Sequence, residues 1–210
     1  MTTASPRELR QREQAERVRE RVLDAAEELF GRHGFRETSL RQVAERCEMS
    51  VGALYLHLPN KDELLRAVID RRGLPLLDRI RSFAEADGAG IDLLVGLVRS
   101  EIMFYRAYPD FGRLMSRLYS SGLAVSPQLS EDIANGYTDA MRLEAEVIQR
   151  GQRDGTICGG DADSLARMLA SMVGAYRNAE ATRPDGTAGI AEEQFVEMVR
   201  RAFATPATAG

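Results

Sequence analysis

Apolar residues recur at intervals of three and four positions along most of this 210-residue chain, a spacing that predicts helices. No segment keeps the alternating apolar and polar pattern of a strand, so the expected fold class is all-α. Clusters of glycine and proline divide the chain into separate helical segments. The expected helices cover residues 18–33, 39–47, 51–58, 61–85, 91–108, 110–119, 129–154, 161–182 and 191–203, and Pro75 is expected to kink or restart the fourth of them.

The N-terminal segment, residues 1–17, interleaves Arg with Glu. Ser5 and Glu8 have the spacing of a capping box, with Pro6 at the first helical position. We interpret the segment either as a mobile arm that reaches the minor groove of DNA or as a solvated extension of the following helix. Residues 1–65 hold 11 Lys or Arg and 12 Asp or Glu, a net charge of −1, and this balance favours the helix extension.

Two short helices joined by a tight turn are predicted between residues 34 and 58. Thr38 or Ser39 caps the first helix, and Ser50 caps the second. The second helix starts with the small residues of the run 51–53, and a helix with such a thin leading edge can enter the major groove of DNA. Short helices joined in this way are also common in small bundles that have no role in DNA binding, so the geometry alone is a weak signal.

Two side chains strengthen the DNA-binding interpretation of this segment. Tyr55 is predicted to point away from the core, where its hydroxyl suits a phosphate. Lys61 starts the next helix and is placed for another phosphate contact. Either residue alone means little, but together with the capped helix they favour a helix-turn-helix.

Charge and composition narrow the classes of function. A net charge of −4 and a pI near 5.4 exclude a strongly basic coat for nucleic acid, so any DNA contact must come from a local basic face. Both histidines lie in the first 60 residues, and no glycine-rich phosphate loop or nucleophile elbow is present, so an enzyme is disfavoured and no catalytic residue or cofactor is predicted. Cys47 and Cys158 stand alone, which predicts neither a metal site nor a disulfide. With no apolar run near 18 residues and no secretory signal after Met1, we expect a cytoplasmic protein without a membrane partner.

Residues 18–65 resemble the DNA-binding domain of the TetR family of transcriptional regulators. The matching run extends from residue 44 to residue 64 and includes Ser50, Gly52, Leu54, Tyr55, His57, Pro59, Lys61 and Leu64. The remaining helices are similar to that family only in architecture. The resemblance implies a three-helix helix-turn-helix DNA-binding domain at residues 18–64 and a helical ligand-binding and dimerisation domain at 65–204, with the arm or extension at 1–17 and a disordered tail at 205–210.

The same resemblance implies a role for each residue of the motif. The predicted DNA-binding residues are Thr38 and Ser39 at phosphate, Arg41 at the groove edge or a phosphate, Ser50 as the cap, Val51, Gly52 and Ala53 at bases, Tyr55 and His57 at the DNA backbone, and Lys61 as a phosphate clamp. An alternative for His57 is a surface histidine at the end of the helix.

Glu48 occupies the turn position where the family usually has glycine. A left-handed backbone there costs a non-glycine residue about 1–2 kcal/mol, so we expect a strained turn. The second helix also lacks Arg, Asn and Gln between residues 51 and 58. Hydrogen-bonded reading of bases is therefore expected from Arg41, Gln42 or Tyr55. Alternatively, specificity rests on DNA shape and half-site spacing.

The second domain carries many large and soft apolar side chains. Methionine and aromatic residues line adaptable ligand cavities, although each of these side chains alone is more simply explained as part of a core. By resemblance, a small molecule would bind there and move the helix that starts near Lys61. The predicted pocket residues are Met103, Phe104, Phe111, Met115, Tyr119, Tyr137, Met141, Met172 and Tyr176.

The last two helices are predicted to form a two-fold dimer interface, as a four-helix bundle shared by two chains. Such a dimer implies a roughly palindromic operator in double-stranded DNA. The residues along the 161–182 helix cannot all serve both the pocket and the interface, and the sequence does not divide them. The predicted interface residues are Leu165, Leu169, Val173, Phe195, Val199 and Phe203.

These features predict a ligand-responsive regulator of transcription that acts as a homodimer. Repression is what the family resemblance implies, with release from the operator caused by a small apolar molecule. A constitutive DNA-binding regulator without a ligand is the alternative, and a filled core in the second domain would favour it.

Overall fold

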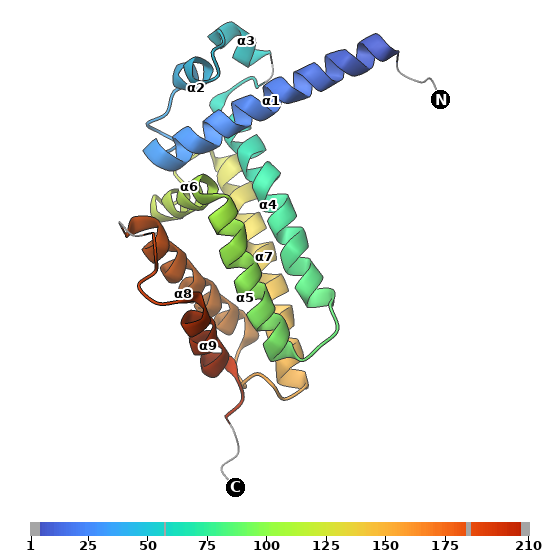
Figure 1. Ribbon diagram of the computed structural model, residues 1–210, viewed down its shortest axis with the longest axis vertical. Coiled ribbons are helices and arrows are strands. Elements are labelled where there is room, and N and C mark those ends of the chain that lie inside the picture. Colours follow the sequence, from blue (N-terminus) through green and yellow to red (C-terminus); the bar gives the residue numbers. More distant parts are fainter. Residues whose placement is uncertain (1–4, 57, 184–185, 207–210) are drawn as a thin grey trace. The chain divides into compact units, whose positions relative to one another are not determined.

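A computed structural model describes residues 5–56, 58–183 and 186–206 of the chain. The described residues are mostly helical, which confirms the all-α fold class (Figure 1). Extended pairing in these residues consists of one isolated antiparallel bridge between Ile157 and Ala204. The helices are α1 Pro6–His33, α2 Leu40–Arg46, α3 Val51–Tyr55, α4 Lys61–Glu85, α5 Gly90–Ala107, α6 Pro109–Ser120, α7 Pro127–Arg153, α8 Ala162–Thr182 and α9 Glu192–Phe203.

The backbone divides into two compact units. Unit 1 consists of Met1–Arg72 and Asp110–Ser130, and unit 2 consists of Gly73–Pro109 and Glu131–Gly210. The helix α6 therefore groups with the N-terminal helices, whereas the sequence placed it in the second domain. The sequence could not anticipate this grouping, because it depends on contacts between segments far apart in the chain.

The C-terminal end of α1 explains why α6 belongs to unit 1. A Cβ at Gly31 would collide with the backbone of Asp110, so the two chain segments approach closely there. The guanidinium of Arg117 donates hydrogen bonds of 3.1 Å to the carbonyl oxygens of Gly31 and Arg32. These carbonyls lie at the end of a helix and lack intrahelical partners, so Arg117 satisfies them.

The capping box predicted at the N-terminus of α1 is confirmed. Oγ of Ser5 accepts a hydrogen bond of 3.3 Å from the backbone N–H of Glu8, whose carboxylate accepts one of 2.7 Å from the N–H of Ser5. The Arg/Glu segment is continuous with α1 and exposed from residue 5 to residue 17, so it forms the helix extension rather than a separate arm. The helix ends at Gly34, where φ is +99°.

Serine caps also set the starts of α2 and α3, as the sequence predicted. Ser39 forms a reciprocal capping box with Gln42, and Oγ of Ser50 accepts a hydrogen bond of 3.1 Å from the N–H of Ala53. The helix α3 ends at Tyr55 rather than at the expected residue 58.

The helix α4 starts at Lys61, as expected. Pro75 lies inside α4 and does not divide it. The side chain of Asn60 starts α4 by accepting a hydrogen bond of 2.8 Å from the N–H of Glu63. The largest fully buried side chains in the first 72 residues are Leu23, Phe30, Leu54, Leu64 and Leu65.

The core of unit 2 is formed mainly by α5, α7, α8 and α9. The first turn of α5 lies so close to the end of α7 that a Cβ on Gly90 would overlap the backbone of Gly151. Asp161 caps α8, as predicted, by accepting a hydrogen bond of 2.8 Å from the N–H of Ser164. Within the described ranges, no helix has the length and apolarity needed to cross a membrane.

The expected disordered tail is only partly covered by the described residues. The N–H of Thr205 donates a hydrogen bond of 3.1 Å to the carbonyl of Thr156, so the tail begins with a backbone contact. Residues 207–210 lie outside the described residues.

Candidate nucleic-acid interface and interior polar site

The turn between α2 and α3 has the backbone conformation that the sequence predicted. Glu48 has a φ of +56°, which places it in the left-handed region. The N–H of Met49 donates a hydrogen bond of 3.0 Å to the carbonyl of Ala44, which closes the turn. A side chain with a Cβ is therefore held where glycine is preferred.

The leading edge of α3 is open to its surroundings. Gly52 is exposed, and the closest neighbour of a Cβ added there would be Oγ of Ser50 at 4.0 Å. Val51 and Ala53 are half-buried, while Leu54 is buried and anchors the helix to unit 1. Because α3 has five residues, its helix dipole is weak. It therefore attracts a phosphate less strongly than a longer helix does.

Two large side chains are exposed at the end of α3. Tyr55 is 49% exposed, as predicted from its position opposite Leu54. Leu56 is also exposed, and the sequence reasoning overlooked it. The sequence did contain a signal for this exposure. Leu54 and Leu58 are four residues apart and define the buried face, so Leu56, which follows the exposed Tyr55, lies on the outer side.

Burial contradicts the expectation that Thr38 meets a phosphate. Thr38 is only 2% exposed, and its hydroxyl donates to the carbonyl oxygens of Gly34 at 2.8 Å and Leu29 at 3.3 Å. A threonine between two helices can cap the second helix or bond back to the end of the first. Thr38 bonds back to the end of α1. Ser39 is exposed, but its hydroxyl bonds to Gln42.

The two cationic residues of the motif differ in how they are held. Arg41 is exposed and donates a hydrogen bond of 2.8 Å to Glu45 on the next turn of α2. Lys61 is half-buried, with Nζ 3.2 Å from the carbonyl oxygen of Arg36 and 4.4 Å from the ring centroid of Phe35. Partial burial lowers the pKa of Lys61. His57 lies outside the described residues.

The predicted pocket residues are divided between the two units. Phe111, Met115 and Tyr119 belong to unit 1, and the other six belong to unit 2. Phe104 and Phe111 are buried, whereas Met103, Tyr119 and Tyr137 are exposed.

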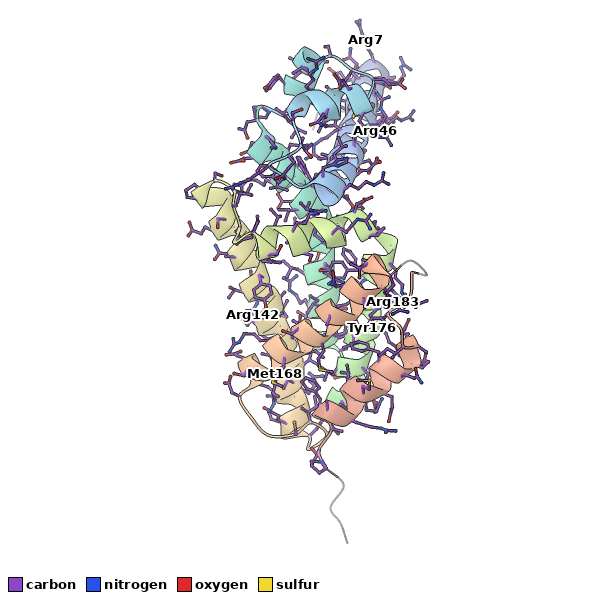
Figure 2. The ribbon with its side chains drawn as sticks, turned by 90° about the vertical axis from the view of Figure 1, so that its left-hand side faces the viewer. Arg7, Arg46, Arg142, Met168, Tyr176 and Arg183 are labelled. Carbon is purple, nitrogen blue, oxygen red and sulfur yellow. The ribbon has the colours of Figure 1, made fainter. Side chains whose placement is uncertain are left out.

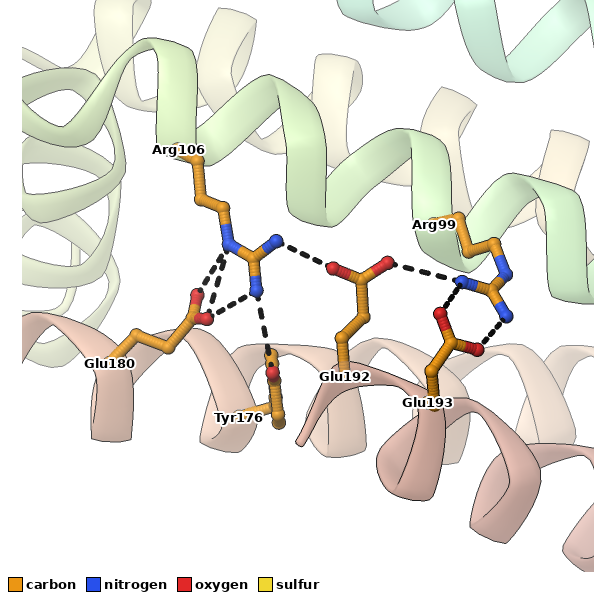
Figure 3. Close-up of polar contacts among 6 residues, drawn as sticks. All are labelled: Arg99, Arg106, Tyr176, Glu180, Glu192 and Glu193. Carbon is orange, nitrogen blue, oxygen red and sulfur yellow. Dashed lines mark hydrogen bonds and ion pairs between the residues drawn. The ribbon is translucent and has the colours of Figure 1, made fainter. Parts of the chain in front are cut away.

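Tyr176 is held in a polar network on unit 2 (Figure 3). Its ring stacks on Phe195 with the centroids 4.3 Å apart, and its hydroxyl accepts a hydrogen bond of 3.4 Å from Arg106. Arg106 also bonds Glu180 of α8 and Glu192 of α9. These contacts fasten α8 and α9 to α5, which gives Tyr176 a structural role.

A polar cluster inside unit 2 was missed by the sequence reasoning. Glu101 and Tyr105 of α5, Glu144 of α7 and Arg177 of α8 interact electrostatically in the interior. The guanidinium of Arg177 lies over the ring of Tyr105, 3.0 Å from its centroid. The only signal in the sequence was a charged residue on an otherwise apolar helix face, which does not reveal burial.

Burial controls the charge of the two acids in this cluster. Desolvation raises the pKa of Glu101 to about 7, and the positive charge of Arg177 opposes it. Desolvation, followed by repulsion from Glu101, raises the pKa of Glu144 well above its usual value. Oε2 of Glu144 and Nε of Arg177 have no hydrogen-bond partner among the described residues.

The predicted dimer-interface residues form part of the interior of a single chain instead. Leu169, Val173, Phe195, Val199 and Phe203 are buried in the core of unit 2, and Leu165 packs against that core. The apolar periodicity of α8 and α9 identified a buried face correctly but assigned it to the wrong partner. Met168, which Figure 2 labels on α8, is 60% exposed, and Met198 on α9 is also exposed.

Comparison with known proteins places this geometry among bacterial regulators. The family model described as bacterial regulatory proteins, tetR family, matches residues 22–68. The HTH-type transcriptional regulator UidR of Escherichia coli is 27% identical over 146 residues, which are 69% of this chain and 71% of UidR.

Two solved structures share the fold over nearly the whole chain. A regulatory protein in the tetR family from Rhodococcus has a TM-score of 0.75 at 22% identity, with coverage of 90% of this chain and 98% of that one. AibR, solved in complex with isovaleryl coenzyme A and operator DNA, has a TM-score of 0.75 at 18% identity, with coverage of 90% and 100%.

Proposed function

Because the chain belongs to the TetR family of transcriptional regulators, we propose that it is a homodimeric repressor that leaves a roughly palindromic operator when a small, largely apolar molecule binds. The family relationship supports regulation of transcription rather than catalysis. The finer assignment rests on the side chains of this chain.

The exposed leading edge of α3 carries the proposal. Gly52 leaves the start of α3 free of side-chain bulk, and Ser50 holds that start in place through its bond to Ala53. Tyr55 is exposed one turn further along and offers a hydroxyl to the DNA backbone. The first turn of a helix can approach base pairs closely only when it is held in place and carries small side chains. The start of α3 meets both conditions.

Exposed positions of α8 and α9 are the proposed dimer face. The buried faces of both helices are already used by the core, so a partner must contact the other side, which includes Met168 and Met198. A two-fold dimer of this kind would place its recognition helices at half-sites about 34–36 Å apart.

Binding-site selection with the purified full-length protein, followed by titration of the selected DNA, tests the proposal. Gly52→Glu adds a negative charge at the proposed DNA surface and meets no steric obstacle, so affinity should fall by at least about 100-fold. Gly136→Glu is the matched control, because Gly136 also lies in a helix with open space around its Cβ position. Equal DNA affinity of the two variants, with unchanged melting temperatures, would overturn the assignment of α3.

The proposed release by a ligand is tested separately. Compounds that raise the melting temperature of the protein should also lower its affinity for the selected DNA, because a ligand shifts the equilibrium only through a preference for the state that does not bind DNA. If no stabilising compound changes DNA affinity, the alternative of a constitutive regulator is favoured.

A further inference from the structure

Two carboxylates are buried in the interior of unit 2 without a matching set of cations. Glu144 of α7 is 2% exposed and Glu101 of α5 is 8% exposed. Repulsion between the two side chains contributes to the raised pKa of Glu144, so they lie close enough to influence each other. A buried carboxylate is costly unless it is paired or hydrogen-bonded.

The nearby arginines compensate these acids only in part, through the charge of Arg177 on Glu101. Arg99 and Arg106 flank Glu101 on α5, but Arg99 is bonded to two glutamates of α9, and Arg106 to one glutamate of α8 and one of α9 (Figure 3). Arg177 stacks on Tyr105. Among the described residues, neither Glu101 nor Glu144 forms an ion pair within 4.0 Å.

One oxygen of the cluster has an unused hydrogen-bonding position. Oε2 of Glu144 is buried and has no hydrogen-bond partner in the described chain. Proteins rarely leave a buried polar atom unsatisfied, and such atoms often mark the position of a bound group. A carboxylate oxygen accepts hydrogen bonds, so the group that completes this site must carry a donor.

The balance of charge selects the kind of donor. When ionised, the two carboxylates and the single guanidinium of Arg177 leave a net charge of −1 in the cluster, so an anionic ligand would meet repulsion. An ammonium group supplies both N–H donors and the missing positive charge.

From these contacts we propose that unit 2 binds a small organic amine with an apolar body, and that Glu144 and Glu101 accept hydrogen bonds from its ammonium group. The proposal rests on the proposed function in that the amine is the molecule to which the regulator responds. It refines the ligand from an apolar molecule to one with an apolar body and a single cationic end.

The protonation behaviour of the two acids agrees with this ligand. Because burial raises the pKa of both acids, each keeps its proton to a higher pH than an exposed glutamate does. An ammonium group takes the place of a proton, so its binding should release protons. The groups that interact electrostatically with the two acids are Tyr105 of α5, Tyr137 of α7 and Arg177 of α8, and the charge of Arg167 of α8 acts on Tyr137.

Matched sets of probes test the chemical class of the ligand. Butylamine, phenethylamine and dodecylamine are each compared, by calorimetry on the full-length protein without DNA, with the alcohol and the carboxylate of the same carbon body. At least one amine should bind 10-fold or more tightly than both of its matched partners. If no amine exceeds its alcohol and its carboxylate, the proposal is wrong, and tighter binding of a carboxylate would assign the site to Arg177.

Substitution of Glu144 tests the position of the site. Glu144→Gln should weaken the binding of the best amine by 10-fold or more and leave the matched alcohol unaffected. Its melting temperature without ligand should be equal to or above that of the original protein, because an unpartnered carboxylate is removed. Glu146→Gln is the control, since Glu146 lies on the same helix and is paired with Arg142 at its surface. A loss of stability in Glu144→Gln, or equal amine binding by the two variants, would contradict the proposal.

The closing measurement separates this inference from the proposed function. The best amine is added to the complex of the protein with its selected DNA. Amine binding without DNA release supports the site but contradicts the proposed regulation. Specific DNA binding by a protein that no amine stabilises supports the regulator and contradicts the site.

Discussion

Nε of Arg72 donates a hydrogen bond of 2.9 Å to Oε2 of Glu27, and this bond joins α4 to α1 within unit 1. Arg71 donates to the same oxygen at 2.5 Å and also bonds Glu20 and Asp24 of α1. Glu27 is 5% exposed, so its charge depends on these two guanidinium groups for compensation. The buried Glu27 therefore holds the first helix against the middle of α4.

Glu27→Ala should lower the free energy of unfolding by about 3–5 kcal/mol, because it leaves two arginines partly buried without their shared partner. Urea denaturation of the full-length protein measures this loss. The control is Glu197→Ala, which removes an exposed pair with Arg201 and should cost at most about 1 kcal/mol. If both variants lose a similar unfolding free energy, then the burial of Glu27 does not strengthen its ion pairs with Arg71 and Arg72.

Glu48→Gly should raise the melting temperature. The φ of +56° strains a residue with a Cβ by about 1–2 kcal/mol, and glycine removes this strain while adding some entropy to the unfolded chain. Calorimetry should show a shift upward by a few degrees. Glu45→Gly, inside α2, should lower the melting temperature instead, because the helical backbone there favours a residue with a side chain. An unchanged or lower value for Glu48→Gly would contradict the strained turn.

Arg41→Ala and Lys61→Ala should affect DNA binding in different ways. Arg41 is exposed on α2 and is expected to contribute to the reading of sequence, so its loss should relax the preference among operator variants. Lys61 is expected to contact phosphate, so its loss should weaken all sites alike and reduce the salt slope by about 1. Titrations of several operator variants at several salt concentrations measure both quantities.

Lys61 also binds the carbonyl of Arg36, so the Lys61 variant requires a test of folding. The melting temperature gives that test, and Lys61→Arg provides a variant that keeps the charge. Equal effects of Arg41→Ala and Lys61→Ala on specificity would refute the division of roles between them.

The stability of the protein should fall as the pH rises from about 5 to about 7.5. Burial raises the pKa of Glu101 from its usual 4.5 to about 7, and that of Glu144 in the same direction, so the folded protein binds more protons than the unfolded chain in this range. Their contribution is complete below the pKa of the unfolded chain and is lost as the pH passes the raised values. Denaturation at a series of pH values should show a smaller slope for Glu101→Gln than for the original protein. An identical slope would mean that Glu101 does not carry this proton.

The sequence by itself determined the local structure of this protein. Ser5, Ser39, Ser50 and Asp161 start helices in the predicted places because a cap bonds to backbone groups two or three residues away. The left-handed turn at Glu48 was expected from the family resemblance, because the family usually has glycine at this position. The family resemblance was likewise carried by a continuous run of residues, and the match at residues 22–68 agrees with it.

Only the tertiary structure decided which partner each surface meets. Periodicity marks an apolar face on α8 and α9 but does not say whether the core of the same chain or a second chain covers it, and here the core covers Val173 and Val199. Burial of Glu144 on α7 beside Glu101 of α5 likewise depends on segments distant in sequence. Charged residues such as Glu144 look alike in a sequence whether they face water or an interior, because desolvation is a property of the packed surroundings and not of the residue.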